Sequence, residues 1–509
     1  MSESNSKRIA KNTLMLYFRQ ILIMFVSLYT VRVVLNVLGA EDYGIYNVVA
    51  GVVTMFGFLS GAMASASQRF FSYEIGVGDK QKLKRTFSVT MLIYVGLTLI
   101  IILLAETIGL WFIYRKLIIP QERLYAAKLI YQFSILSFGI TMITTPYMSA
   151  IIAHECMNIY AYVSVIEVLL RLGIVFILKI IPLDKLIVYG ILMFLVTFLN
   201  TAIYRIVCKR KFEECKFSLF WDKLMVKEIV GFTGWTIFGA FTSMARTQAI
   251  TVLVNQFFNP IVVTSRTISM QVSNTLNVFS TNFNTSLYAP IVKEYSADRK
   301  ETMVSLVFNG CKITFFLMWI FSLPLFLRMD FVLTLWLKEI PEYVVIFTQL
   351  SIIEVLIGSI SLPITTAARA PGKMKVYELT LGSLQILLFC ITYINLKYYN
   401  GSPNSIYWIA IIVNIIMFFV RLYIVKGLVG LPLFTFLLKV LIPIIIIICI
   451  SSVSSFLLNK IIPNTFLGFC AIFLFSVLLS SFLMIFIGMD KIMRESILEK
   501  LRMKLRCKK

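Results

Sequence analysis

Long apolar runs without a charged residue are the feature that most constrains this chain. Two of the longest are residues 440–458 and 466–487. A run of about 18 or more apolar residues can cross roughly 30 Å of hydrocarbon as an α-helix. Lipid offers no hydrogen bonds to the backbone, so only helices or closed β-barrels span it, and these runs lack the period-two alternation of a barrel strand. The sequence therefore predicts an all-α integral membrane protein.

Similar runs recur along the whole chain, which is 509 residues long, 59% hydrophobic and only 14% charged. A soluble domain of this length needs more charge to cover its surface, so no soluble domain is expected. We expect about fourteen transmembrane helices joined mostly by short loops. Their ranges are 12–38, 44–70, 86–114, 124–150, 158–180, 185–207, 228–255, 261–289, 302–326, 342–367, 374–396, 404–427, 434–458 and 465–488.

The remaining chemistry-bearing residues argue against several classes of protein. The first apolar stretch is long, contains Arg19 and Arg32, and has no clear cleavage site, so we expect it to stay in the mature protein. The eight cysteines are scattered and His154 is the only histidine, so no disulfide framework or histidine-based metal site is expected. There is no Walker loop and no paired-acid metal motif. We therefore expect no enzyme activity, catalytic residue, cofactor, metal or nucleic-acid partner.

The basic residues alternate between loops. Loops on one side, together with the tail at 491–509, carry far more Lys and Arg than loops on the other side. Under the positive-inside rule, this predicts an even number of spans with both termini in the cytoplasm. The formal net charge of +23 has two interpretations. It reflects this topology and contact with anionic lipids, or it includes a cationic cavity for an anionic substrate.

The chain also carries signs of an internal repeat. Pro146 and Pro363 end two spans, and a tyrosine follows each after the same short turn, with both pairs offset by 217 residues. Gly78-Asp79 and Ala297-Asp298 pair in the same way at an offset of 219. The repeat is six spans long, and since six is even, both copies have the same orientation in the membrane.

The repeat predicts the domain organisation. We expect two six-helix lobes at residues 1–215 and 216–430 around a central cavity, and two additional transmembrane helices at 431–490. The basic cytoplasmic tail at 491–509 alternates charge with apolar residues, which is typical of an amphipathic helix on the inner leaflet.

Polar side chains are concentrated in the first two spans of each repeat copy. The eighth span is the clearest case, because residues 264–286 read TSRTISMQVSNTLNVFSTNFNTS. Surfaces that face lipid are apolar, so this span must face protein or water. One interpretation is that these side chains form hydrogen bonds between packed helices. The other is that the first, second, seventh and eighth spans line a cavity.

Arginines in the spans suggest what such a cavity binds. Glu167 and Arg171 are spaced to form an ion pair on one helix, whereas Arg19, Arg246 and Arg266 have no obvious local carboxylate. Contact with a substrate, a long-range structural pair and snorkelling remain open for these three. Guanidinium groups suit phosphate, and amides suit hydroxyl-rich ligands. The candidate substrate-binding residues are Arg19, Arg246, Arg266, Gln271, Asn274, Asn277 and Gln248.

The N-terminal region resembles a known family. Residues 31–39 (VRVVLNVLG) and 41–46 (EDYGIY) resemble the start of polysaccharide biosynthesis flippases. These belong to the multidrug/oligosaccharidyl-lipid/polysaccharide exporter superfamily. Residues 68–72 (QRFFS) and the Gly78-Asp79 loop are also similar to that family. The resemblance extends over essentially the whole chain in span count and repeat.

This resemblance implies two six-helix lobes that form a V around a central cavity. It also implies a multi-pass protein of the bacterial inner membrane that translocates an undecaprenyl-pyrophosphate-linked oligosaccharide, such as an O-antigen or capsule repeat unit for lipopolysaccharide or polysaccharide biosynthesis. Membrane lipids and other polysaccharide assembly proteins are the further partners expected. The resemblance points to Arg19, Arg246 and Arg266 only by their position in the spans.

Three alternatives remain. Lipid II-type flippases also have fourteen spans and cavity arginines. Cation-coupled multidrug exporters of the superfamily typically keep an acid in the first span, where this chain has arginines. A membrane-embedded saccharide polymerase or ligase belongs to a different class and usually needs a large outer loop, which the predicted topology lacks.

Overall fold

The computed structural model describes residues 3–54, 56–111, 120–218, 220–258, 260–337 and 340–489, together with Arg494. Every long regular element in this part of the chain is a helix, which confirms the predicted fold class. The predicted amphipathic tail at 491–509 lies outside the described residues apart from Arg494, and the side chain of Arg32 is also outside them.

Among the residues that the structure describes, ten helical segments are long and apolar enough to cross a membrane. They coincide with the third, fourth, sixth and seventh predicted spans and with the ninth to the fourteenth. The other four predicted spans fall on α1 (Glu3–Thr54), α2 (Gly57–Val77), α6 (Met157–Ile180) and α9 (Pro260–Ser296). The many Asn, Gln, Ser and Thr residues of α9 lower its hydropathy, although it is 37 residues long.

The first two predicted spans are separated where we expected them to be. We expected a break between residues 38 and 44, and α1 consists of two helical segments joined across a kink in this interval. The kink lies at Gly39, where φ is 81° and ψ is 167°. A positive φ of this kind favours glycine because a Cβ atom would clash with the backbone. The second predicted span therefore consists of the end of α1 followed by α2.

Contacts between helices divide the chain into two compact units. The N-unit comprises Ser2–Phe241 and Tyr288–Asp298, and the C-unit comprises Thr242–Leu287 and Arg299–Lys509. Both α8 (Lys223–Phe257) and α9 contribute one part to each unit. The lobe boundary that we placed between residues 215 and 216 is a division of the sequence repeat and stays a prediction.

The N-unit is built around α5 (Leu124–Ala153), which packs against α2, α3 (Lys80–Leu104) and α7 (Lys185–Lys211). In addition, α1 packs along α6. One of its cores contains aromatic side chains from four helices, Phe71, Phe87, Tyr147 and Tyr204. Packing of large apolar side chains from several helices fixes the N-unit helices against one another.

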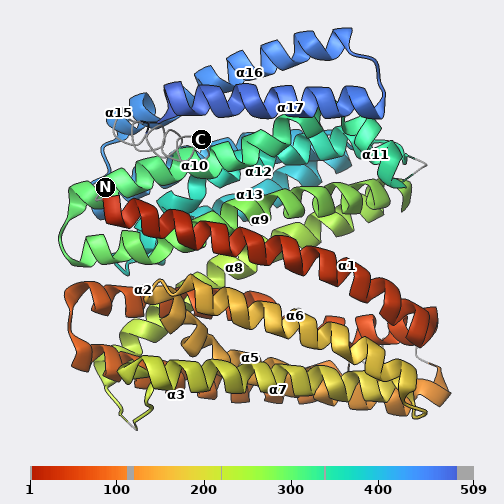
Figure 1. Ribbon diagram of the computed structural model, residues 1–509, viewed down its shortest axis with the longest axis vertical. Helices are drawn as coiled ribbons and strands as arrows, with labels where there is room; N and C mark the ends of the chain where they lie inside the picture. Colours follow the sequence, from red (N-terminus) through yellow and green to blue (C-terminus); the bar gives the residue numbers. More distant parts are fainter. Residues whose placement is uncertain are drawn as a thin grey trace, which may run out of the picture. The chain divides into compact units, whose positions relative to one another are not determined.

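The C-unit is built around α12 (Val344–Arg369), which packs against α10 (Lys300–Leu327) and α14 (Ser405–Val429). The short helix α11 (Met329–Leu337) was not expected from the sequence, and α13 (Lys375–Tyr398) packs on α14. The last two spans are α15 (Leu433–Phe436) with α16 (Ile442–Ile461), and α17 (Phe466–Leu483). Figure 1 shows α16 and α17 in blue, side by side, and α17 also packs against α10.

The repeat predicted from the sequence has counterparts in the backbone. Pro146 lies inside α5 and Pro363 lies inside α12. After these helices, Glu155 has a φ of 60° and Gly372 has a φ of 80°, and these two residues are again 217 positions apart. Two turns of the same unusual shape at the repeat spacing indicate that α5 and α12 are equivalent helices.

Candidate functional site

One face of α9 carries exposed polar side chains. Thr267, Gln271 and Asn274 are exposed, whereas Ser269 and Ser273 on the opposite side of the helix are buried. Positions three and four residues apart lie on the same helical face, so the exposed residues form a continuous polar stripe. A stripe with free amides is costly against hydrocarbon, so we infer that this face meets water or a polar ligand.

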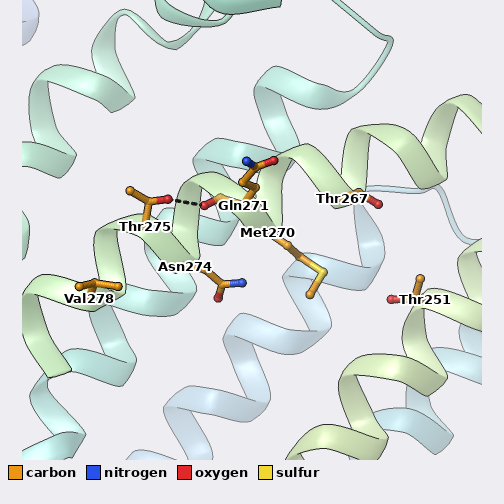
Figure 2. Close-up of a pocket in the computed structure, with 7 residues that line it drawn as sticks. All are labelled: Thr251, Thr267, Met270, Gln271, Asn274, Thr275 and Val278. Carbon is orange, nitrogen blue, oxygen red and sulfur yellow. Dashed lines mark hydrogen bonds between the residues drawn. The ribbon is translucent and has the colours of Figure 1, made fainter. Parts of the chain in front are cut away.

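The stripe forms one wall of an open pocket of about 550 Å³ within the C-unit (Figure 2). This size is within the range of roughly 300–1,000 Å³ found for small-molecule sites. Met270 extends from α9 toward the helix that carries Thr251 (Figure 2). The lining residues are Thr251 from α8 and Thr267, Met270, Gln271, Asn274, Thr275 and Val278 from α9.

Some polar groups of this pocket already have hydrogen-bond partners, and others do not. The hydroxyl of Thr275 donates to the carbonyl oxygen of Gln271 at 2.8 Å, and Thr267 donates to Val263 at 3.0 Å. Such bonds within the helix leave these hydroxyls with little need for a ligand. By contrast, the side-chain amides of Gln271 and Asn274 have no hydrogen-bond partner among the described residues. Their donors and acceptors are available to a ligand in the pocket.

Arg266 is connected to this pocket through Thr251, one of the lining residues. Its side chain is buried, and Nε donates to Oγ1 of Thr251 at 3.3 Å. The guanidinium carbon is 5.8 Å from the centre of the Tyr407 ring. The hydroxyl of Tyr407 is in turn 2.7 Å from Oγ of Ser269. This network holds a cation beside the pocket with no carboxylate among the partners that the structure describes.

Arg246 has a partner that is far away in the sequence. Its Nη1 is 3.3 Å from Oε1 of Glu354 on α12, and the amide nitrogen of Asn414 on α14 donates to the same oxygen at 3.0 Å. The Nε of Arg246 is buried without a hydrogen-bond partner in the described part of the chain. A long-range pair was one of the interpretations left open for this arginine, and the structure provides one.

The two arginine networks meet the same face of α14. Tyr407 and Asn414 are seven residues apart, which is two helical turns or about 10 Å. The guanidinium of Arg266 lies near the ring of Tyr407, and Arg246 and Asn414 both contact Glu354. The C-unit therefore connects Arg246 and Arg266 to residues two turns apart on one face of α14.

The other candidate residues lie elsewhere. Arg19 belongs to the N-unit, where its buried guanidinium lies 4.5 Å from the centre of the Tyr160 ring. Gln248 is exposed on α8 but does not line the pocket, and Asn277 is half-buried on α9. The structure places Arg246, Arg266 and the amides of α9 in the C-unit, and the substrate-binding role of all seven candidates stays a prediction.

Three of the carboxylates embedded in the helices have described partners. Glu167 pairs with Arg171 at 2.6 Å, which confirms the predicted pair on α6, and it also accepts from Asn200 at 2.8 Å. Glu106 accepts from the amide of Gln132 at 3.1 Å. Glu167 and Glu354 thus each contact an arginine, whereas Glu106 accepts from an uncharged amide.

Sequence reasoning missed Glu354, Asn414 and Tyr407 as parts of the site. One signal was present, because Asn414 is an isolated amide in the apolar segment IAIIVNIIMFFV of residues 409–420. A lone amide in such a segment usually has a hydrogen-bonding partner on another helix. The identity of that partner was not readable, since Glu354 is 60 residues away from it.

Comparisons with known proteins identify the fold. No family model matches the chain, and no curated protein matches it. Among solved structures, an outward-facing multidrug resistance MATE family transporter of the MOP superfamily aligns with a TM-score of 0.72 at 12% identity. That alignment covers 84% of this chain and 96% of the transporter.

Two further structures give similar alignments. A Vibrio cholerae MATE transporter in its bent form has a TM-score of 0.65 at 16% identity, over 84% of this chain and 97% of its own. A MOP superfamily transporter from Pyrococcus furiosus has a TM-score of 0.66 at 12% identity, over 83% of this chain and 96% of its own. Its description states that the reverse polarity of its binding pocket suggests a different function. The chain thus has the fold of these transporters and is a multi-pass membrane protein.

Proposed function

We propose that this protein is a flippase that translocates an undecaprenyl-pyrophosphate-linked oligosaccharide, such as an O-antigen or capsule repeat unit, by alternating access. Its place of action is the bacterial inner membrane, with both termini in the cytoplasm. The observation that carries the proposal is the pairing of an exposed amide stripe on α9 with two nearby arginines in a transporter fold.

The sugar part of such a substrate suits the pocket on α9. Gln271 and Asn274 each present an amide that both donates and accepts hydrogen bonds. Sugars offer many hydroxyls that do the same. Since the two amides have no partner in the described structure, a sugar satisfies them without displacing an existing bond.

The pyrophosphate suits the arginines. Guanidinium groups bind phosphate oxygens with paired, charge-assisted hydrogen bonds. Arg246 makes one described hydrogen bond, and Arg266 bonds a neutral threonine hydroxyl. Both have donors left for an anion.

The lipid tail has a candidate groove in the same unit. An apolar cavity of about 660 Å³ lies among α10, α12 and α16. The indole nitrogen of Trp319 at this groove donates to Ser451, so its polar group is already satisfied. An apolar surface of this kind favours a polyprenyl chain over a soluble drug. Representative lining residues are Phe315, Trp319, Leu356, Ile360, Ile444 and Ile448.

A multidrug exporter is the second candidate, because an aligned structure is described as a multidrug resistance transporter. Export of cationic drugs needs an available acid, and Glu167 and Glu354 already contact arginines. For the Pyrococcus furiosus transporter, a binding pocket of reverse polarity is likewise described as suggesting a different function. The arginine-rich site therefore favours an anionic substrate.

Deletion of the gene tests the proposal. We expect undecaprenyl-linked repeat units to accumulate on the inner leaflet, measured by mass spectrometry of extracted lipids, and surface glycan to be lost. Normal surface glycan in the deletion strain would contradict the proposal. Loss of peptidoglycan synthesis would identify a lipid II-type flippase instead. Drug resistance on expression, together with normal glycan, would favour the exporter.

A further inference from the structure

We propose that Glu354 is a resident anion of this site: it occupies Arg246 when no substrate is bound, and the substrate's phosphate displaces it. This inference rests on the proposed function and adds a residue that sets the affinity for the anionic headgroup. It concerns contacts inside the C-unit, where α8, α12 and α14 meet.

The ion pair between Arg246 and Glu354 has a weak geometry for an arginine–carboxylate contact. One nitrogen of the guanidinium meets one oxygen of the carboxylate at 3.3 Å, whereas strong arginine–carboxylate pairs form two parallel bonds near 2.8 Å. For comparison, the Arg171–Glu167 contact on α6 is 2.6 Å. A single long contact is more easily exchanged than a paired one.

Arg246 is also incompletely bonded. A guanidinium has five N–H donors, yet Arg246 makes one hydrogen bond within the described residues, and its buried Nε has none. A phosphate group offers more oxygens and more negative charge than one carboxylate oxygen. Arg246 therefore gains hydrogen bonds when a phosphate replaces Glu354.

Glu354 retains a partner after the exchange. Asn414 donates to its Oε1 at 3.0 Å from a different helix, so this bond does not depend on Arg246. The side chains of Arg246 and Glu354 are 20% and 23% exposed, which leaves both accessible to water and to an incoming anion. The carboxylate thus has a position to occupy when the arginine turns to the substrate.

An equivalent arrangement in the N-unit provides a matched control. Glu167 also combines an arginine and an asparagine, and its Asn200 lies on α7. However, Arg171 is on the same helix as Glu167, and the contact is short. Replacing Glu167 therefore removes the same chemical groups without touching the proposed site.

Binding of inorganic pyrophosphate to the purified full-length protein in lipid nanodiscs tests the inference. We expect Glu354→Gln to bind pyrophosphate on the order of fivefold more tightly than the natural chain, because a competing ion pair is removed. Glu354→Asp keeps the charge and should restore affinity toward the natural value. Arg246→Gln should weaken binding, and in that background Glu354→Gln should have no further effect. Glu167→Gln should bind like the natural chain.

The possible outcomes separate this inference from the proposed function. If the natural chain binds pyrophosphate and Arg246→Gln binds weakly, but Glu354→Gln is unchanged or weaker, Glu354 is only a structural partner and the inference fails. If no variant binds pyrophosphate, both the inference and the pyrophosphate site of the proposed function are contradicted. Thermal unfolding of each variant identifies any that is misfolded. If Glu354→Gln is misfolded, the affinity of Glu354→Asp for pyrophosphate is compared with that of the natural chain instead.

Discussion

At the scale of single residues, burial of a cation without a carboxylate is the most informative feature. Arg266 is buried beside Thr251 and Tyr407, neither of which neutralises it. A buried cation of this kind is costly unless an anion approaches it during function. Arg246 differs, since Glu354 neutralises it in the state described here. The two arginines are therefore expected to differ in how their removal affects stability and transport.

Replacement of either arginine tests its role in transport. Arg246→Ala and Arg266→Ala should each fail to restore surface glycan to the deletion strain, with transport lowered at least about tenfold, because about 1.4 kcal/mol of phosphate binding is lost. Western blotting of membranes should show normal insertion. Full complementation by both variants would remove them from the mechanism.

Glu214 provides a prediction about pH outside the membrane spans. It contacts Nε2 of His154, whose ring stacks on Phe212 at 4.2 Å. Burial acts to raise the pKa of Glu214, but hydrogen bonds to His154 and to its own backbone outweigh this, so the pKa is lowered from its ordinary value. A lowered pKa means that the ionised carboxylate stabilises the folded state above the ordinary pKa of about 4.3, and that this stabilisation is lost as the pH falls further.

Glu214→Gln should therefore lower the unfolding temperature at pH 7, and the difference from the natural chain should shrink as the pH falls below about 4.3. Thermal unfolding in detergent at several pH values measures this. A difference that does not depend on pH would show that the side chain contributes through packing alone.

At the scale of helices, α9 has two faces with different roles. Its buried face carries serines that bond within the C-unit, such as Ser269 with Tyr407. Its exposed face carries amides without described partners, Gln271 and Asn274. The sequence shows only that the helix is polar, and the separation into faces depends on which side the C-unit covers.

Replacement of the exposed amides tests this division. Asn274→Leu and Gln271→Leu should change the free energy of unfolding by less than about 0.5 kcal/mol, since no described bond is broken. Both should lower transport of the lipid-linked oligosaccharide about tenfold, measured by glycan complementation. Ser383→Leu, an exposed position on α13 whose hydroxyl bonds to its own helix, is the control and should transport normally. Unchanged transport in both amide variants would exclude the stripe from substrate binding.

One arginine forms hydrogen bonds to the hairpin of α16 and α17. Arg328 lies between α10 and α11, and its guanidinium donates to the side chains of Asn459 and Asn464 and to the carbonyl oxygen of Ile462. These groups come from the end of α16 and the loop that follows it. The arginine therefore ties the last two helices to the rest of the C-unit.

Arg328→Met should destabilise the protein by about 3 kcal/mol, because the hydrogen bonds of a buried guanidinium are all lost at once. The result should be a lower unfolding temperature and protease cleavage in the loop at residues 462–465. Arg328→Lys should recover only part of the loss, since an ammonium group cannot reach all the acceptors in one plane. Unchanged stability in Arg328→Met would show that packing alone holds the hairpin.

At the scale of the whole molecule, topology in the membrane is the main untested expectation. The basic loops predict an even number of spans with both termini in the cytoplasm. Alkaline phosphatase fused at either terminus should be inactive, and fusion at the loop containing Gly401 should be active. Activity at one terminus alone would imply an odd number of spans.

Much of the fold was predictable because it depends on local properties. Run length and the absence of charge located the apolar spans, since a helix in lipid must satisfy its backbone within itself. Matching prolines and tyrosines indicated the repeat, which the left-handed turns at Glu155 and Gly372 support. The kink at Gly39 lies within the predicted break between residues 38 and 44, whereas the short helix α11 was missed because a nine-residue segment leaves a weak signal.

The candidate site was only partly predictable. The sequence by itself determined that the chain is helical, spans a membrane and carries arginines and amides within its spans. Only the tertiary structure decided that Arg246 contacts Glu354, 108 residues away. It also decided that Arg266 lies near Tyr407, on the α14 face that carries Asn414. Helical periodicity reports which residues share a face, but pairing between helices depends on how they pack, and that is set by many apolar contacts at once.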